Sequence, residues 1–250
     1  MKTNRTIIIT AIFVAIFFSA CDKNSFTIRG TLENGANKTI YLEELTPEGT
    51  LFIDSIKLDN QGHFKYSYKM PYQSLYNLHT TADNYIILLP DYGEKIDITG
   101  DYRNLSMTYN VTGSPQSILL WQLQDYTNDG SRLIIELVDT TNYYKQLQAD
   151  GLATEAQVKA KKAETDSIYR LAFTAQQDYV CRFIEENPGS LATLIALYKP
   201  FNNRPLIAPE SNFDYYEFVL DGLQERQPDN PHTIHFKNTV ERMRFQLSQQ

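Results

Sequence analysis

Apolar and polar residues alternate along residues 26–112, as they do in strands that bury one face and expose the other. The alternation is clearest over residues 26–29 and 64–69, where every second side chain is aromatic or aliphatic. Turn signals containing Gly or Asn separate these runs at residues 33–35, 59–62 and 91–93. Short strands at this spacing are typical of a sandwich or a barrel, and we expect an antiparallel β-sandwich-like domain over residues 24–113.

The hydrophobic period becomes that of a helix after Gly113. Ser114 followed by Pro115 is typical of a helix start, because serine caps the first turn and proline fits the first helical position. Thr154 with Gln157 forms a capping box, which predicts the start of a second long helix. The second half of the chain is therefore expected to be helical.

The second long helix is expected to end at residues 187–189, where Asn-Pro-Gly interrupts the pattern. We expect one apolar stripe of this helix to face the core, formed by Ile168, Leu171, Ala172, Ala175, Tyr179 and Phe183. Residues 200–210 contain three prolines and are expected to form a loop. Shorter helices are expected over residues 190–199, 211–223 and 231–247, with Asn230 capping the last.

The N-terminal residues have the three parts of a secretion signal. Lys2 and Arg5 give a positive start, residues 7–18 are mostly apolar, and small side chains precede Cys21. The apolar run is too short to span a bilayer of about 30 Å as a helix. The residues around Cys21 resemble the lipobox of bacterial lipoproteins, which implies a lipid anchor on this cysteine. The alternative is an ordinary cleavable signal followed by an incidental cysteine.

These patterns together predict an α+β protein in four parts. We expect a signal peptide over residues 1–20, a lipidated cysteine and tether over 21–23, a β domain over 24–113 and an α-helical domain over 114–250. A composition of 42% hydrophobic residues is enough for a packed core.

Net charge argues against two classes of partner. The formal charge of the chain is −7, and removal of Lys2 and Arg5 with the signal leaves −9. This acidic balance disfavours binding to nucleic acid, which needs clustered Lys and Arg. It also disfavours docking on anionic lipid headgroups by charge, so we expect the membrane to be held through lipid alone.

The strand half resembles the small β domain DUF4369, which precedes a thioredoxin-like domain in many envelope lipoproteins of Gram-negative bacteria. The residues that carry this resemblance are 26–30, 40–42, 53–56, 62–64, 88–90, 96–98 and 111–114. Residues 183–194 are similar to the helical connector of those proteins. The resemblance implies a lipid-anchored protein of the cell envelope, most simply of the outer membrane. Because no thioredoxin domain follows the connector here, we expect a standalone version of the non-catalytic half.

Cysteine content and motifs argue against catalysis. The chain has two cysteines and no Cys-x-x-Cys pair, and lipidation of Cys21 would leave Cys181 as a structural, inert thiol. There is no Gly-x-Ser-x-Gly elbow and no glycine-rich phosphate loop. We therefore expect no enzyme activity, no catalytic residue, no cofactor and no metal site.

The histidines are expected to be solvated. His232 and His235 lie near the start of a predicted helix, where two imidazoles are too few for a closed zinc site. His63 follows a turn glycine, and His79 is out of phase with its apolar neighbours, so both should face water.

Acidic residues also have structural interpretations. Residues 59–62 resemble the start of a calcium loop, but the following residues lack the required oxygen ligands, so a hairpin turn is expected. Asp97 and Asp101 lie where a strand ends and are not assigned as a glycosidase pair.

Tyrosine is unusually common, with 17 residues against one tryptophan. Tyrosine suits strands and is also enriched at protein interfaces, because its ring is apolar and its tip is polar. One interpretation is that these rings cover sheet faces and core edges. The other is a contact surface, for which the candidates are Tyr72, Tyr76, Tyr92, Tyr215 and Tyr216.

Three functions remain open at this stage. The leading hypothesis is a non-catalytic envelope lipoprotein that acts as a binding or scaffolding module. A second is an accessory or truncated relative of a thioredoxin-like thiol:disulfide oxidoreductase, with a thioredoxin-like protein as partner. A third is a surface glycan-binding lipoprotein, which rests on the tyrosines alone.

Overall fold

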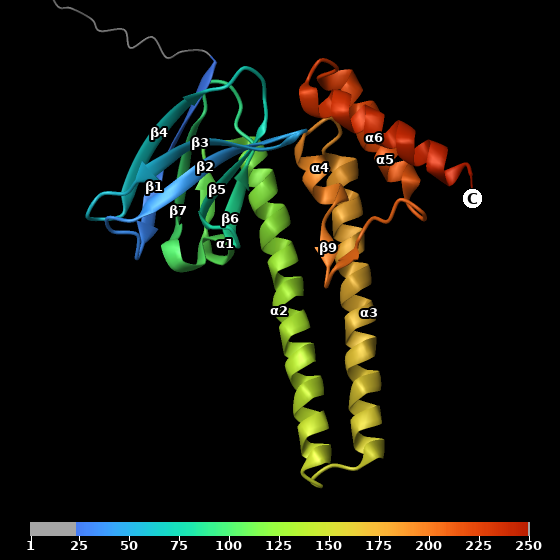
Figure 1. Ribbon diagram of the computed structural model, residues 1–250. Helices are drawn as coiled ribbons and strands as arrows, with labels where there is room; N and C mark the ends of the chain where they lie inside the picture. The colour runs from blue at the N-terminus through green and yellow to red at the C-terminus, as the bar shows by residue number, and fades with distance from the viewer. Residues whose placement is uncertain (1–23, 250) are drawn as a thin grey trace, which may run out of the picture.

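A computed structural model describes residues 24–249 (Figure 1). The predicted signal peptide and the predicted lipid site at Cys21 lie outside the described residues. The first part of the described chain forms two four-stranded sheets, with strand orders β4-β1-β7-β8 and β3-β2-β5-β6. The strands are β1 (Ser25–Glu33), β2 (Thr39–Thr46), β3 (Gly49–Lys57), β4 (His63–Lys69), β5 (Leu75–Thr81), β6 (Asn84–Leu88), β7 (Lys95–Asp101) and β8 (Asn110–Thr112).

The expected sandwich is present, but one strand pair differs from the expected direction. β1 and β7 run parallel, with Thr27 beside Lys95 and Glu33 beside Asp101. The other pairs among the described strands are antiparallel. Alternation reports which face a side chain takes and says nothing about the direction of the neighbouring strand. The alternation could therefore not predict that β1 pairs with β7, from which five other strands separate it along the chain.

The turn at residues 59–62 is also not the hairpin turn that we expected. It joins β3 of one sheet to β4 of the other. The Asp59 carboxylate accepts hydrogen bonds from the backbone N–H groups of Gln61 and His63, at 2.8 and 2.9 Å. The turn chemistry was correct, but a local turn signal does not encode which sheet receives the next strand.

The rest of the chain is mainly helical. A 3-10 turn η1 (Tyr102–Asn104) and a short helix α1 (Leu105–Thr108) connect β7 to β8. The other elements are α2 (Pro115–Ala149), α3 (Glu155–Glu186), α4 (Ala192–Leu197), β9 (Pro200–Phe201), β10 (Arg204–Pro205), α5 (Phe213–Arg226) and α6 (Pro231–Leu247). The helix starts follow the predicted caps: Ser114 caps α2, the Thr154 capping box opens α3, and Asn230 caps α6.

The predicted apolar stripe of α3 is mostly wrong: Phe183 is its one buried member, and Ala172 and Tyr179 are half-buried. Ile168, Leu171 and Ala175 are exposed, Ile168 at 37% and Leu171 at 71%. The buried positions of α3 are Thr165, Phe173, Gln176, Val180, Phe183 and Ile184. The buried face follows whatever packs against the helix, and α4 and α5 contact α3 toward its C-terminal half. Over the first half, only α2 lies alongside (Figure 1).

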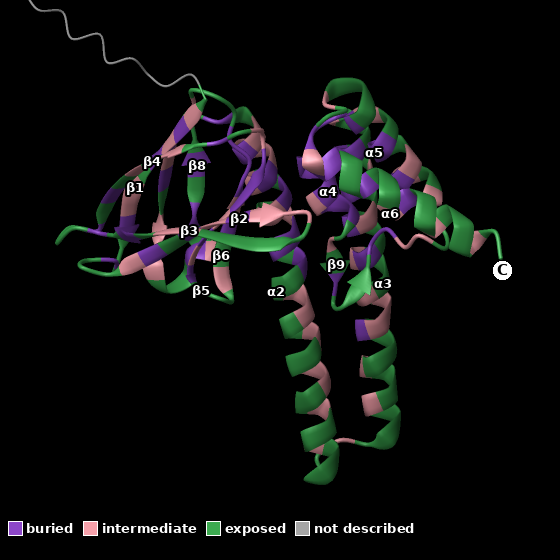
Figure 2. Cartoon of the chain, turned by 45° about the horizontal axis from the view of Figure 1, so that its top comes forward, coloured by how far each residue is buried: buried purple, intermediate pink, exposed green. Residues whose placement is uncertain are grey.

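Two hydrophobic cores meet at a shared boundary. One core fills the sandwich. The other lies among the helices from α2 through α6 and includes Leu75 and Leu89 of the β part. Away from this boundary, α2 and α3 project together as a long antiparallel pair whose far half is mostly exposed (Figure 2). We call residues 131–172, the distal part of this pair, the arm. Along residues 24–249, no helix combines the length and the apolar character needed to cross a membrane.

Candidate binding groove

A groove of about 760 Å³ lies between the β2–β3 turn and the start of α6. It is formed by residues from both parts of the chain, so its shape depends on how the two parts are joined. Tyr72 is one of the candidate tyrosines for a contact surface, and it lines this groove. The lining residues are Thr46, Pro47, Glu48, Gly49, Thr50, Leu51, Tyr72, Pro231, Ile234, His235 and Asn238.

Hydrogen bonds fix the start of α6 against the segment before β5. The Asn230 side chain accepts a hydrogen bond from the backbone N–H of His232 at 2.9 Å and donates one to the Gln73 carbonyl at 2.8 Å. The His232 ring lies 3.0 Å from the Ser74 hydroxyl, and both residues are buried. The expectation that His232 is solvated is therefore wrong, because the β part covers the helix start.

Burial lowers the pKa of His232 to about 4, with a smaller contribution from His235. The unfolded chain binds a proton near pH 6.5, whereas the folded chain resists it until about pH 4. The resulting stability is therefore complete above pH 6.5 and is lost as the pH falls toward 4. We expect the free energy of unfolding to drop by about 3 kcal/mol over this range from His232 alone.

Chemical denaturation at pH 7 and at pH 4.5 measures this effect. His232→Gln cannot titrate, so its free energy of unfolding should fall less between the two pH values than that of the parent. His63→Gln is the control, since that ring is half exposed and pairs with Asp59 at the surface. Equal pH dependence in the parent and His232→Gln would contradict the assignment.

A buried carboxylate lies at the end of the sandwich beside Tyr72. Glu44 is 3% exposed, and its Oε1 atom has no hydrogen-bond partner among the described residues. Burial raises the pKa of Tyr72, and the charge of Glu44 and a side-chain hydrogen bond to it raise it further. Burial likewise raises the pKa of Tyr76, with smaller contributions from Glu44 and Tyr68. Burial, and after it the charge of Glu44, also raises the pKa of Tyr68. Three tyrosines therefore lie near one acid, an arrangement that strand alternation did not reveal.

The five candidate tyrosines do not form one surface. Tyr76 and Tyr216 are buried, at 0% and 1% exposure, so their expected role in a contact surface is wrong. Tyr76 packs in the core of the sandwich, and Tyr216 packs in the core of the helical part. Tyr92 is 43% exposed and donates to the Pro71 carbonyl. Tyr215 is half-buried on α5 and donates to Glu185 at 2.7 Å.

Beside the groove lies an exposed edge strand that the sequence reasoning missed. Among the described strands, β3 pairs only with β2. Its Leu51 and Phe52 side chains are 53% and 57% exposed, and Leu51 lines the groove. The signal was present: three apolar residues in succession, 51–53, break the alternation. The register shifts at this point, opposite Leu42 and Glu43, which is the sign of a β-bulge.

Comparison with known families assigns the β part. Residues 26–120 match the family model described as "Domain of unknown function (DUF4369)". This part of the chain is a DUF4369 domain. No curated protein and no solved structure matches the chain.

The DUF4369 match extends past β8 into α2, and the contacts explain why. The Ser117 hydroxyl accepts a hydrogen bond from the backbone N–H of Leu89 at 3.0 Å. Trp121 donates its indole N–H to the Tyr109 carbonyl at 2.9 Å, and its ring packs on the sandwich core. The first turns of α2 are therefore physically part of the DUF4369 domain.

The two aspartates of β7 have structural roles in the DUF4369 domain. Asp97 forms two hydrogen bonds with the Arg29 guanidinium, at 2.6 and 3.0 Å, and this contact lowers the pKa of Asp97. Asp101 caps η1 and accepts a hydrogen bond from Asn34 at 2.9 Å. Both carboxylates are thus engaged within the domain.

His79 and Cys181 lie in partly buried surroundings. The expectation that His79 faces water is wrong: its side chain is 16% exposed, stacks on Tyr41 and lies 3.4 Å from Glu43. Burial raises the pKa of the Cys181 thiol, which makes this thiol less reactive. Over residues 24–249, no group of three His, Cys, Asp or Glu side chains is arranged to hold a metal ion.

Lys199 is a partly buried cation at the boundary between the DUF4369 domain and the helices. Burial lowers its pKa to about 8, and its ammonium donates to the Gln124 side-chain oxygen. The cavity beside it has a volume of about 20 Å³, which is room for one water molecule and too small for a substrate. No sequence signal marked this lysine, because its burial depends on the docking of the two parts.

Proposed function

We propose that this chain is a non-catalytic, lipid-anchored binding and scaffolding protein of the cell envelope. In this proposal, the outer edge of β3 and the adjoining groove hold an extended segment of a partner protein. The observation that carries it is the nine-residue edge strand β3, on which Leu51 and Phe52 are exposed and Leu51 lines the groove. The anchor and the envelope location in this proposal rest on the signal-like residues 1–21 and on the DUF4369 resemblance.

An exposed edge strand is a ready template for a further strand. Its unpaired N–H and C=O groups can hydrogen-bond to an added chain, and monomeric proteins usually protect such edges. Exposed apolar side chains on an edge increase this tendency, whereas charged ones reduce it. Strand addition is an established mode of peptide recognition, in which the backbone gives affinity and alternate side chains give specificity.

The groove supplies the second half of such a site. Leu51, Pro231 and Ile234 provide apolar contact, and Ile234 is 51% exposed. His235 and Asn238 on α6 place polar groups in the same groove, where they can orient a bound backbone. Because the Asn230 and His232 contacts fix α6 to the β part, the groove is preformed, which lowers the entropic cost of binding.

Site-specific photo-cross-linking in cells that express the full chain tests this function. A photoreactive phenylalanine analogue replaces Phe52 in one variant and Phe245 in a control variant. Phe245 is 67% exposed on α6 and lies outside the groove, so it matches Phe52 in chemistry and exposure. We expect a discrete adduct from position 52 and none from position 245.

A substitution in the groove provides a second test of strand addition. A second change, Leu51→Lys, should reduce the position-52 adduct at least several-fold, because a charge replaces apolar contact in the groove. Equal adducts at positions 52 and 245, or no adduct at position 52, would refute strand addition. Capture of a thioredoxin-like protein would make the chain an accessory of envelope thiol chemistry, in line with the domain resemblance.

A further inference from the structure

The arm exposes several large apolar side chains. Ile135, Leu152 and Leu171 are 61%, 74% and 71% exposed, and Val138 and Tyr143 are 49% and 61% exposed. Figure 2 shows that the far half of α2 and α3 is largely exposed, and at the base of the arm the Tyr169 ring also packs on Phe201 of β9. Helices in water gain most of their stability from tertiary packing, so an arm of two helices with apolar outer positions lacks a partner.

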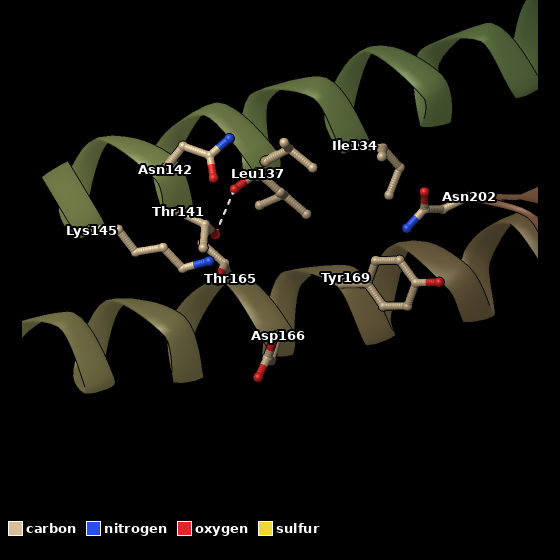
Figure 3. Close-up of a pocket in the computed structure, with 10 residues that line it drawn as sticks. Ile134, Leu137, Thr141, Asn142, Lys145, Thr165, Asp166, Tyr169 and Asn202 are labelled. Atoms are coloured by element: carbon tan, nitrogen blue, oxygen red, sulfur yellow. Dashed lines mark hydrogen bonds between the residues drawn. The ribbon is translucent and has the colours of Figure 1, made fainter.

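The seam between the two helices of the arm is also incompletely filled. A cleft of about 270 Å³ opens along it (Figure 3), and Val138 is among its lining residues. Figure 3 shows Leu137 and Thr141 of α2 facing Thr165 and Tyr169 of α3 across this space. This cleft leaves Ile134, Leu137 and Tyr169 accessible to side chains of a further helix.

Charge on the arm is arranged in bands. Its six basic and six acidic residues cancel, although the whole chain carries −7. To compare positions on the two helices, we give each residue a level, which is its distance from the tip in residues. Levels start at Ala149, the last residue of α2, and at Glu155, the first residue of α3. The tip, at level zero, holds Asp150 and Glu155. A basic band at levels four to seven holds Lys145, Lys159, Lys161 and Lys162.

Two further bands follow toward the base of the arm. An acidic band at levels nine to thirteen holds Glu136, Asp139, Glu164 and Asp166. An arginine band at levels fifteen to seventeen holds Arg132 and Arg170. Within the chain, Lys161 pairs with Glu164 at 2.8 Å, Lys162 with Asp166 at 2.5 Å and Arg132 with Asp129 at 2.5 Å. Surface pairs of this kind contribute little and leave the net sign of each band unchanged.

We propose that the arms of two copies of this chain pack antiparallel to form a four-helix bundle. A two-fold axis about eight residues from the tip places level zero of one arm at about level sixteen of the other. In this register, the lysine band meets the acidic band, and the acidic tip meets the arginine band. The exposed Leu152 at the tip reaches the level of the exposed Leu171.

The available area suits a stable dimer. About twenty residues of each helix, at 1.5 Å per residue, make the arm about 30 Å long, and two adjacent helices are about 20 Å wide. One face therefore buries about 600 Å² per copy, or about 1,200 Å² in total, which is the lower end of the range for specific interfaces. Complementary bands add orientation, because a parallel arrangement would place like charges together.

Disulfide formation between introduced cysteines tests the relative orientation of the two arms directly. In a Cys181→Ser background, differently tagged full chains carrying Leu152→Cys or Leu171→Cys are co-expressed and oxidised in detergent solution. The antiparallel dimer predicts mainly 152–171 disulfides, at least about tenfold above 152–152 links. Both leucines are over 70% exposed, so the substitutions leave the core intact. Dominant 152–152 links, or no intermolecular disulfide, would overturn the proposal.

Sedimentation of the full chain tests the charge pattern independently. The triple variant Lys159→Glu, Lys161→Glu and Lys162→Glu should raise the dimer dissociation constant about tenfold or more at low salt. Changing Glu136, Asp139 and Asp166 to lysine in a second chain should restore association only when the two variants are mixed. A wild-type chain that remains monomeric at about 100 μM, or variants that associate as the wild type does, would refute the bundle.

Discussion

Replacing Gly30 with alanine should destabilise the DUF4369 domain by more than about 4 kcal/mol, enough to unfold many domains of this size. Gly30 lies in β1, between Phe64 of β4 and Ile98 of the parallel strand β7. A Cβ atom at this position would lie 1.8 Å from the backbone oxygen of Ile98 and 2.8 Å from its carbonyl carbon. Backbone atoms cannot rotate away as a side chain can, so the two strands would have to separate.

Gly93→Ala is the matched control for this prediction. Gly93 has φ of +79°, and a Cβ atom there would meet no heavy atom within 4 Å. Its cost should be about 1 kcal/mol, from backbone strain alone. Denaturant unfolding of both variants measures the difference. If Gly30→Ala proves no more destabilising than Gly93→Ala, the close approach of β1 and β7 is wrong.

Replacing Cys21 with serine should release the protein from the membrane. A lipidated cysteine anchors through buried acyl chains, each methylene contributing about 0.8 kcal/mol, so removal of the acceptor thiol abolishes attachment. Fractionation of cells into membrane and soluble parts, with labelled fatty acid as tracer, measures the change. The wild type should be labelled and sediment with membranes, and Cys21→Ser should be neither labelled nor sedimented.

Cys181→Ser is the control for the lipid prediction. This half-buried thiol on α3 is the other cysteine of the chain, and its replacement should leave labelling and membrane attachment unchanged. An unlabelled wild type would favour the alternative, an ordinary cleavable signal followed by an incidental cysteine. Loss of label in both variants would point to misfolding instead of a lost lipid site.

Local signals in the sequence determined the identity of the elements. Ser114, the Thr154–Gln157 box and Asn230 predicted three helix starts, because a cap is a contact between residues a few positions apart. Period-two alternation predicted the strand half for the same reason, since neighbours along a strand take opposite faces. The resemblance at residues 26–30 and 111–114 likewise anticipated the DUF4369 domain.

Only the tertiary structure decided which residues are covered. Tyr76, Tyr216 and His232 are buried because distant segments pack over them, which no local pattern records. Ile168 and Leu171 are exposed for the converse reason: their helix continues beyond the elements that cover its other half. The groove and the burial of Glu44 arise from residues far apart in the chain. Burial and partnership depend on three-dimensional neighbours, whereas caps and alternation depend on neighbours in sequence.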